Sequence, residues 1–215
     1  MKDENIEFYL NKFSYIENEK DIDISFIKPL QRRRLSLVDK FSLDILNKIV
    51  TKDIENIIFA SQYGEFERLK KMIEQYQTEN EVSPSYFSCS VHNFPPAFYL
   101  LTKKLSIPYT SIGAGNNTLS IGILTSAISK FKKNLFCYSD VNDKKSVGFG
   151  INLSKTKTSS SKKYRITLNQ YSEQKNNTSR FNEIEEFNEF VKLFSGKQNS
   201  IKTNLYNIER VLDEK

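Results

Sequence analysis

The sequence predicts an α/β protein: half of a layered fold with a mostly parallel sheet, helices on both faces and a late antiparallel hairpin. Short apolar runs typical of buried strands alternate with segments of helical periodicity, and two segments with strand-like alternation follow near the end. At 215 residues, with 38% hydrophobic and 13% aromatic content, the chain can bury one substantial core. We therefore expect residues 1–215 to form a single domain.

The first part of the chain predicts strand, helix, strand and helix. Aromatic and aliphatic residues favour a strand over Ile6–Ile16. Pro29–Lys48 begins with a proline in the first turn, where helices accept one, and continues with apolar residues at helical spacing. Ile57–Ala60 indicates a buried strand, and the turn at Gly64 leads into a predicted helix over Glu65–Tyr76.

The middle of the chain predicts an elbow, in which a strand turns sharply into a helix. Prolines bracket an extended segment, Tyr86–Val91, and then start a helix over Ala97–Leu105. Tyr109–Ala114 favours a strand that ends in small residues, and Leu119–Phe131 has helical composition. An elbow of this kind places one backbone position at a helix N-terminus, where N–H groups and the helix dipole favour developing negative charge.

The last third predicts a further strand, the hairpin and a closing helix. Leu135–Tyr138 indicates a buried strand, and the spacing of Val147–Leu153 and Tyr164–Gln170 suits a hairpin. Phe181–Phe194 ends in an amphipathic helix, and the tail Ile201–Leu212 is apolar enough to dock.

Charge and composition exclude several classes of function. The net charge is +6, but basic residues are interspersed with 26 acidic ones, so we expect a solvated surface and no nucleic-acid partner. A narrower hypothesis is that Arg32, Arg33 and Arg34 bind an acidic protein partner. No apolar stretch is long enough to span a membrane, and the polar start is unlike a signal peptide, so we expect a cytoplasmic protein.

The sequence predicts neither a metal site nor a cofactor. It has one histidine and two cysteines, Cys89 and Cys137, with no zinc-like spacing, and its carboxylates are scattered. Gly64 supplies a turn and belongs to no glycine-rich phosphate loop. Both cysteines lie in apolar or small-residue segments that resemble strands, which favours buried, reduced thiols that pack in the core.

Several short motifs, taken in order, carry a resemblance to a known family. They are Phe59-Ala60-Ser61-Gln62-Tyr63-Gly64-Glu65, Ser83-Pro84, Phe87-Ser88-Cys89-Ser90-Val91-His92-Asn93, and Ala114-Gly115 with Leu119. With this spacing the chain resembles the β-ketoacyl synthase-like N-terminal-domain family from Pro29 to Arg210. The resemblance implies half of a thiolase-like fold and a place in acyl-chain assembly, because such proteins are encoded beside type II fatty acid, polyketide and aryl polyene pathways.

The same resemblance implies that the nucleophile is missing. Residues 113–119 line up with the Thr-Ala-Cys-Ser-Ser-Ser-Leu motif of full condensing enzymes, which puts Gly115 at the position of the cysteine. Condensation needs a thiolate that forms and releases a thioester, and glycine offers only backbone. The resemblance thus implies a noncatalytic pseudo-ketosynthase that associates with a full-length ketosynthase, an acyl carrier protein or a second copy of itself.

Other residues near the predicted elbow keep two hypotheses open. His92 is either a structural, hydrogen-bonded histidine or a general base in an enzyme of altered chemistry on a carrier-protein or coenzyme A thioester. Asn116 and Asn117 either cap the helix, which we favour, or hold a carbonyl where an active relative has its oxyanion hole. Our candidate ligand-binding residues are His92, Asn93, Gly115, Asn116 and Asn117.

A group of aromatic residues also allows two interpretations. The group either lines an acyl tunnel or packs in a core or subunit interface, and we favour an interface because a lone thiolase-like half would expose apolar surface. Its members are Tyr86, Phe87, Phe94, Phe98 and Tyr99.

Overall fold

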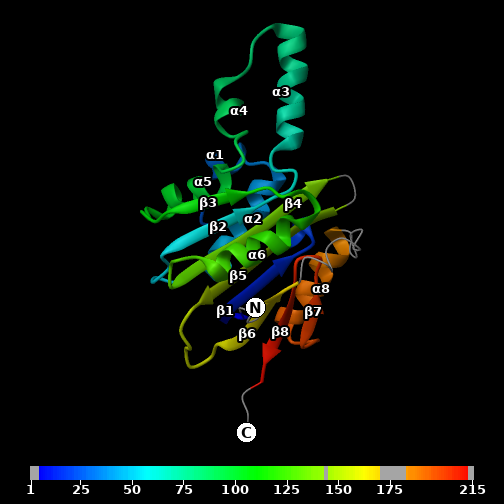
Figure 1. The fold of residues 1–215 in the computed structure, drawn as a ribbon. Coiled ribbons are helices and arrows are strands. Elements are labelled where there is room, and N and C mark those ends of the chain that lie inside the picture. The colour runs from blue at the N-terminus through cyan, green and yellow to red at the C-terminus, as the bar shows by residue number, and fades with distance from the viewer. Residues whose placement is uncertain (1–4, 143–144, 170–182, 213–215) are drawn as a thin grey trace.

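The computed structural model describes residues 5–142, 145–169 and 183–212, which form an eight-stranded sheet covered by helices on both faces (Figure 1). The strands are β1 (Asn5–Ile16), β2 (Asn56–Ala60), β3 (Tyr109–Ile112), β4 (Lys133–Asn142), β5 (Lys145–Ser154), β6 (Lys162–Leu168), β7 (Ser200–Lys202) and β8 (Tyr206–Val211). Their order across the sheet is β3-β2-β4-β5-β1-β6-β8-β7. The α/β class is confirmed. Gln170 and Phe181, the limits of two predicted elements, lie outside the described residues.

The prediction of a mostly parallel sheet is wrong. Only β2–β3 and β2–β4 are parallel pairs. The other neighbouring pairs, from β4–β5 to β7–β8, are antiparallel. Parallel neighbours arise where helical crossovers return the chain in the same direction, and among sheet neighbours this happens only from β2 through β3 to β4.

The expected hairpin between the segments around β5 and β6 is also wrong, because β1 lies between them. β1 pairs with β5 on one side, with Phe13 opposite Ile151, and with β6 on the other, with Phe8 opposite Tyr164. Among the described strands, the antiparallel neighbours that follow each other in sequence are β4–β5 and β7–β8. The spacing of residues predicted β5 and β6, but it could not show that β1, from the N-terminal part of the chain, lies between them.

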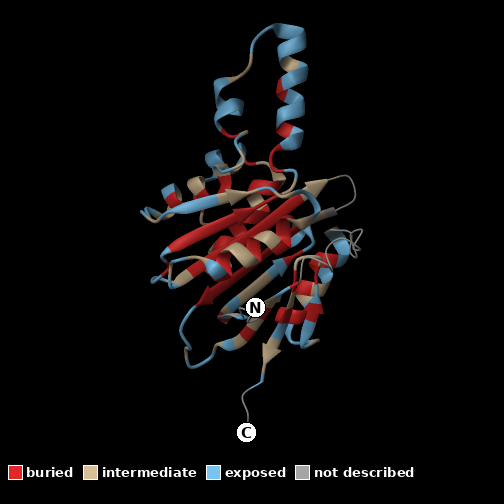
Figure 2. Cartoon of the chain, viewed as in Figure 1, coloured by how far each residue is buried: buried red, intermediate tan, exposed pale blue. Residues whose placement is uncertain are grey.

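Helices cover both faces of the sheet, and two more project beyond it (Figures 1 and 2). They are α1 (Pro29–Arg32), α2 (Leu37–Ile49), α3 (Phe66–Glu79), α4 (Pro84–Ser88), α5 (Phe94–Lys103), α6 (Thr118–Ile128) and α8 (Glu183–Ser195), with short 3-10 turns at Glu19–Asp21 and Gly115–Asn117. One apolar cluster joins α2 and α5 to one face of the sheet, and a second joins α6 and α8 to the other. Helices on both faces are thereby confirmed.

Two local predictions needed correction. The helix expected over Pro29–Lys48 is two helices, because Ser36 caps α2: its Oγ accepts from the Asp39 N–H at 3.1 Å and the Asp39 carboxylate accepts from the Ser36 N–H at 2.9 Å. The expected extended segment Tyr86–Val91 is wrong in its first half, because α4 begins at Pro84 and uses the proline in its first turn.

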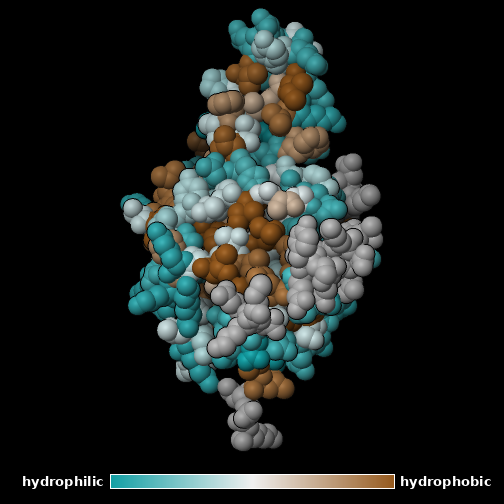
Figure 3. All heavy atoms as spheres, in the orientation of Figure 1, coloured by the Kyte–Doolittle hydropathy of each residue, from teal (hydrophilic) through white to brown (hydrophobic). Residues whose placement is uncertain are grey.

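α3 and α4 form an arm, residues 66–88, that projects beyond the sheet (Figure 1). Only Arg68 and Met72 of α3 are buried, and most of the arm is exposed (Figure 2). Figure 3 shows apolar side chains on its surface. The aromatic group noted in the sequence is accordingly divided: Tyr86 and Phe87 are exposed on the arm, whereas Tyr99 is fully buried.

In the part of the chain that the structure describes, no helix has the length and apolar character needed to cross a membrane.

Candidate functional site

The elbow expected from the sequence is present between β3 and α6. β3 ends at Ile112, and the 3-10 turn Gly115–Asn117 leads into α6. Thr118 closes this turn, because its Oγ1 accepts from the Ala114 N–H at 2.9 Å and donates to the Gly115 carbonyl at 2.6 Å. The elbow is therefore held by a side chain from the first turn of the helix.

Gly115 is the exposed residue at the tip of the elbow. Its φ of +55° lies in the left-handed region, where glycine carries no steric cost. A Cβ placed on Gly115 would meet nothing within 4 Å, so a side chain there would point into open space. The position has the room that a nucleophile would occupy, but this chain fills it with backbone alone.

Beside the elbow, the Ser61–Gly64 loop after β2 is organised by a buried carboxylate. Asp140 of β4 accepts hydrogen bonds from the Ser61 Oγ at 2.6 Å, from the Gln62 N–H at 2.9 Å and from the Tyr63 N–H at 3.0 Å. The Gly64 N–H donates to the Ser61 Oγ at 2.8 Å. Sequence reasoning missed this loop's anchor, because Asp140 lies more than seventy residues beyond the loop and resembles a residue at a strand end.

His92 lies against this loop and against the elbow. Its Nε2 is 2.8 Å from the Ser61 carbonyl oxygen, and because a carbonyl only accepts, Nε2 carries a proton and donates it. Its ring packs on Phe59, and a Cβ on Gly64 or on Gly113 would lie 2.9 Å or 3.8 Å from ring atoms. The predicted approach of His92 to the elbow is thus seen in the structure, with Nε2 engaged in a structural hydrogen bond.

Asn117 occupies the N-cap position of α6, but it makes no capping hydrogen bond through its side chain, so the favoured prediction of side-chain capping is wrong. The Asn116 Oδ1 accepts from the Gln62 amide at 3.4 Å, and the Asn117 Oδ1 accepts from the Asn204 amide at 3.5 Å. The Thr118 hydroxyl bonds to the backbone of Ala114 and Gly115, before α6, and so holds the turn rather than capping the helix. Asn93 precedes α5, is exposed and makes no capping bond through its side chain.

The first turns of α6 are held by hydrogen bonds with α8 and β8. The Ser120 hydroxyl donates to Glu186 of α8, and the Tyr206 hydroxyl of β8 donates to the Ser120 carbonyl at 2.9 Å. Burial, reinforced by the negative charge of Glu186, raises the pKa of Tyr206 well above its ordinary value. The elbow therefore depends on elements from the last third of the chain.

Both cysteines are free thiols, and neither lies on the elbow. Cys137 is fully buried in β4, and burial raises the pKa of its thiol far above the ordinary value, so it is not a nucleophile. Cys89 follows α4 and its Sγ is 3.8 Å from the Ser88 Oγ, which corrects the expectation that it lies in a strand. Core packing is confirmed for Cys137.

The three arginines of the Arg32–Arg34 run have different surroundings. The Arg32 guanidinium donates to the carbonyls of Ile27 at 2.5 Å and Ser25 at 2.7 Å, which commits it to the chain segment before α1. Arg33 and Arg34 are exposed and line a cavity of about 320 Å³ at the base of the arm.

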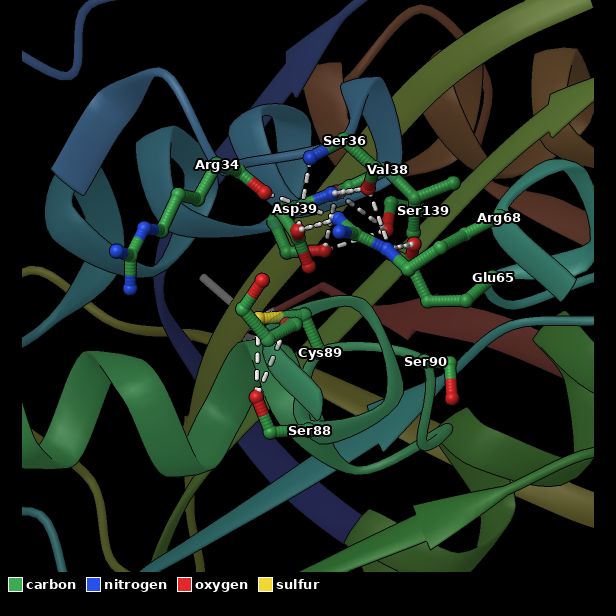
Figure 4. Close-up of polar contacts among 12 residues, drawn as sticks. Arg34, Ser36, Val38, Asp39, Glu65, Arg68, Ser88, Cys89, Ser90 and Ser139 are labelled. Carbon is green, nitrogen blue, oxygen red and sulfur yellow. Dashed lines mark hydrogen bonds and ion pairs between the residues drawn. The ribbon is translucent and has the colours of Figure 1, made fainter. Parts of the chain in front are cut away.

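A buried charge cluster borders this cavity, and two of its members, Ser36 and Arg68, line the cavity wall (Figure 4). Arg68 of α3 donates to Glu65 at 2.7 Å and to Asp39 at 3.1 Å, and the Ser36 hydroxyl donates to Glu65 at 2.6 Å. Burial and the neighbouring charge of Glu65 raise the pKa of Asp39 well above its ordinary value. One guanidinium thus serves two carboxylates, and this ties the arm to the start of α2.

Residues 10–135 match the model of the β-ketoacyl synthase N-terminal domain. The chain belongs to this family. Among curated proteins, no sequence matches the chain at a significant level. No group of histidine, cysteine, aspartate and glutamate side chains suited to a metal ion occurs within residues 5–142, 145–169 and 183–212.

Solved structures confirm that this β-ketoacyl synthase N-terminal domain has the expected thiolase-like ketosynthase fold. One similar chain comes from the structure of the ketosynthase ApeO in complex with its chain length factor ApeC from Xenorhabdus doucetiae: the TM-score is 0.73, the identity is 14%, and the match covers 94% of this chain and 99% of that one. The ishigamide ketosynthase/chain length factor matches with a TM-score of 0.56 and 9% identity over 72% of this chain and 55% of that one.

Proposed function

We propose that this chain is a noncatalytic partner subunit of a full ketosynthase, which helps to hold or measure an acyl chain on its carrier protein in a type II fatty acid or polyketide pathway of the aryl polyene kind. The observation that carries the proposal is Gly115 at the tip of the elbow. The elbow keeps the geometry that presents a group at a helix N-terminus, but glycine presents no side chain. Acyl transfer needs a thiolate at this point.

Neither thiol of the chain substitutes for the missing one. Cys137 is enclosed in the core with a raised pKa, and Cys89 is 7% exposed at the end of α4. Thioester formation needs an accessible thiolate. The chain therefore lacks the first reactant of a condensation, and a partner that supplies it is the simplest complement.

The arm supplies a surface for such a partner. Phe66, Leu69, Ile73 and Tyr76 recur at helical spacing along α3 and are between 46% and 56% exposed; we call them the apolar stripe. A stripe with this spacing is typical of a helix that packs against another protein. The names of both similar structures pair a ketosynthase with a chain length factor, which supports a ketosynthase as the partner.

The test combines the purified chain with a pathway ketosynthase and a carrier-protein thioester. We expect a complex in mass photometry, a change in the rate or product length of the ketosynthase, and no condensation by the chain alone. Ile73→Glu should weaken the complex by about tenfold or more, because it charges the centre of the apolar stripe. Glu74→Ala, the matched control at the next exposed position, should leave it within about twofold.

The alternative is an enzyme of altered chemistry with His92 as its base, and the position of His92 beside the elbow favours it. Against it, the ring nitrogen nearest Gly113 is Nε2, which already carries a proton and donates it to Ser61. Turnover of an acyl thioester by the chain alone, abolished by His92→Ala, would establish the alternative and overturn the proposal of a noncatalytic subunit.

A further inference from the structure

The cavity at the base of the arm has an excess of positive charge that the described structure does not neutralise. Its walls come from the connection between α1 and α2 on one side and from α3 and α4 on the other, and its volume is about 320 Å³. Arg33, Arg34 and Lys71 line it with exposed side chains and form no ion pair with any described residue. Glu67 is the one acidic residue on the wall.

The nearby buried carboxylates do not offset this charge, because they are engaged elsewhere. Asp39 and Glu65 both bind the Arg68 guanidinium, and the raised pKa of Asp39 shows that the surroundings favour its neutral form. In Figure 4 the Arg34 side chain extends away from this cluster, and only its backbone carbonyl turns toward it, accepting from Arg68 at 3.1 Å. Asp39 and Glu65 therefore pair with Arg68, and the described structure shows no ion pair between them and Arg33, Arg34 or Lys71.

We propose that this cavity binds the phosphate of a small phosphorylated molecule that also carries an aromatic or apolar group. Two arginines and a lysine that line one cavity suit a phosphate dianion, because guanidinium groups can bind its oxygens in pairs and lysine adds a point charge. This site shares no residue with Gly115 or the apolar stripe, although it uses Arg33 and Arg34, for which the sequence also suggested an acidic protein partner.

The size and lining of the cavity indicate more than a bare phosphate. Its volume lies at the lower end of the range of small-molecule sites, which leaves space beside the anion for an organic group. Tyr86, 45% exposed, and Leu37 both line the cavity. The Arg68 guanidinium lies 5.7 Å from the centre of the Tyr86 ring, a cation–π contact that holds the wall in place.

The test titrates phenyl phosphate into the full chain at low ionic strength, followed by calorimetry and by ³¹P NMR. We expect a dissociation constant of about 1 mM or tighter, which weakens as salt is added. The double variant Arg34→Gln with Lys71→Gln should lower the affinity by about tenfold or more. Lys70→Gln is the matched control: Lys70 is exposed on the same helix but does not line the cavity, so the affinity should change less than about twofold.

Three comparisons separate this site from general attraction of anions. Equal losses in the Lys70→Gln control and in the double variant, or no binding of phenyl phosphate at all, would overturn the proposal. If glutarate binds as tightly as phenyl phosphate, the cavity does not select phosphate and the proposal is refuted. If inorganic phosphate binds as tightly as phenyl phosphate, the cavity does not bind the organic group, which also refutes the proposal. Tyr86→Leu should weaken phenyl phosphate and leave inorganic phosphate unchanged, and unaltered melting temperatures would show that the variants remain folded.

Discussion

Replacing Gly115 with cysteine tests whether the elbow is a vacant nucleophile position. At φ +55° a side chain costs roughly 1–2 kcal/mol of backbone strain. The loss of a glycine from the unfolded chain returns about 0.4–1 kcal/mol. A Cβ there meets nothing within 4 Å, so no clash is added. We therefore expect Gly115→Cys to destabilise the fold by about 1 kcal/mol, which lowers the melting temperature by about 2–4 °C for a chain of this size.

The matched control is Gly122→Ala in the middle of α6. A Cβ at Gly122 would lie 2.2 Å from a ring carbon of the buried Phe136 and 3.2 Å from the Cβ of Ala60. Overpacking of this kind costs about 3 kcal/mol or more when the neighbours cannot yield. Thermal melts by circular dichroism should therefore rank Gly122→Ala well below Gly115→Cys, although the wild-type glycine at 122 has an ordinary φ.

The same variant measures the electrostatics of the helix N-terminus. The thiol introduced by Gly115→Cys should ionise below the ordinary pKa of a free cysteine, about 8.5, because it lies in the 3-10 turn that leads directly into the N-terminus of α6. The pH dependence of alkylation by iodoacetamide, read by mass spectrometry against the wild-type background, gives this pKa. A pKa at or above the ordinary value, or a loss of stability as large as that of Gly122→Ala, would refute the vacant-site argument.

Three further predictions concern the buried charges. Asp140→Ala should cost about 3 kcal/mol in urea unfolding, because it leaves the Ser61–Gly64 loop without its acceptor; a loss below about 1 kcal/mol would contradict this role. Arg68→Met should cost about 3–5 kcal/mol, because two buried carboxylates lose their shared cation, and an unchanged urea midpoint would disprove that dependence. Because the folded-state pKa of Asp39 is raised, the folded chain keeps a proton that the unfolded chain releases, so stability is lost as the pH rises from about 4 through the raised value. Asp39→Asn cannot ionise, so its stability relative to the wild type should increase across that range, and parallel urea midpoints from pH 4 to pH 7 would rule this out.

Local signals predicted much of the fold and part of the site. β1, β2 and α6 follow from runs of apolar residues and from helical periodicity, which act between near neighbours in the chain. The elbow was also local, because a strand, small residues and a helix follow one another over a few residues. Its resemblance to condensing enzymes is consistent with the family match, and it located Gly115.

Local sequence patterns did not predict the residues that support the elbow and the neighbouring loop through long-range contacts. Asp140 anchors a loop from a different part of the chain, and Glu186 and Tyr206 support α6 from elements far beyond it. Arg68 looks like an ordinary surface charge of an amphipathic helix, and only the packing of α3 on the start of α2 buries it. Such partners are chosen by spatial proximity, to which spacing in the sequence gives no guide.

The sequence also predicted that strands exist without correctly predicting their directions or their neighbours in the sheet. The pattern of residues was sufficient for the existence of most strands, for the alternation of helices and strands, and for an elbow with glycine at position 115. Only the folded chain decided that β1 enters between β5 and β6, and that the neighbouring pairs from β4–β5 to β7–β8 are antiparallel. A residue pattern reports which face of an element is apolar, whereas the choice of neighbour depends on how all the apolar faces are buried together.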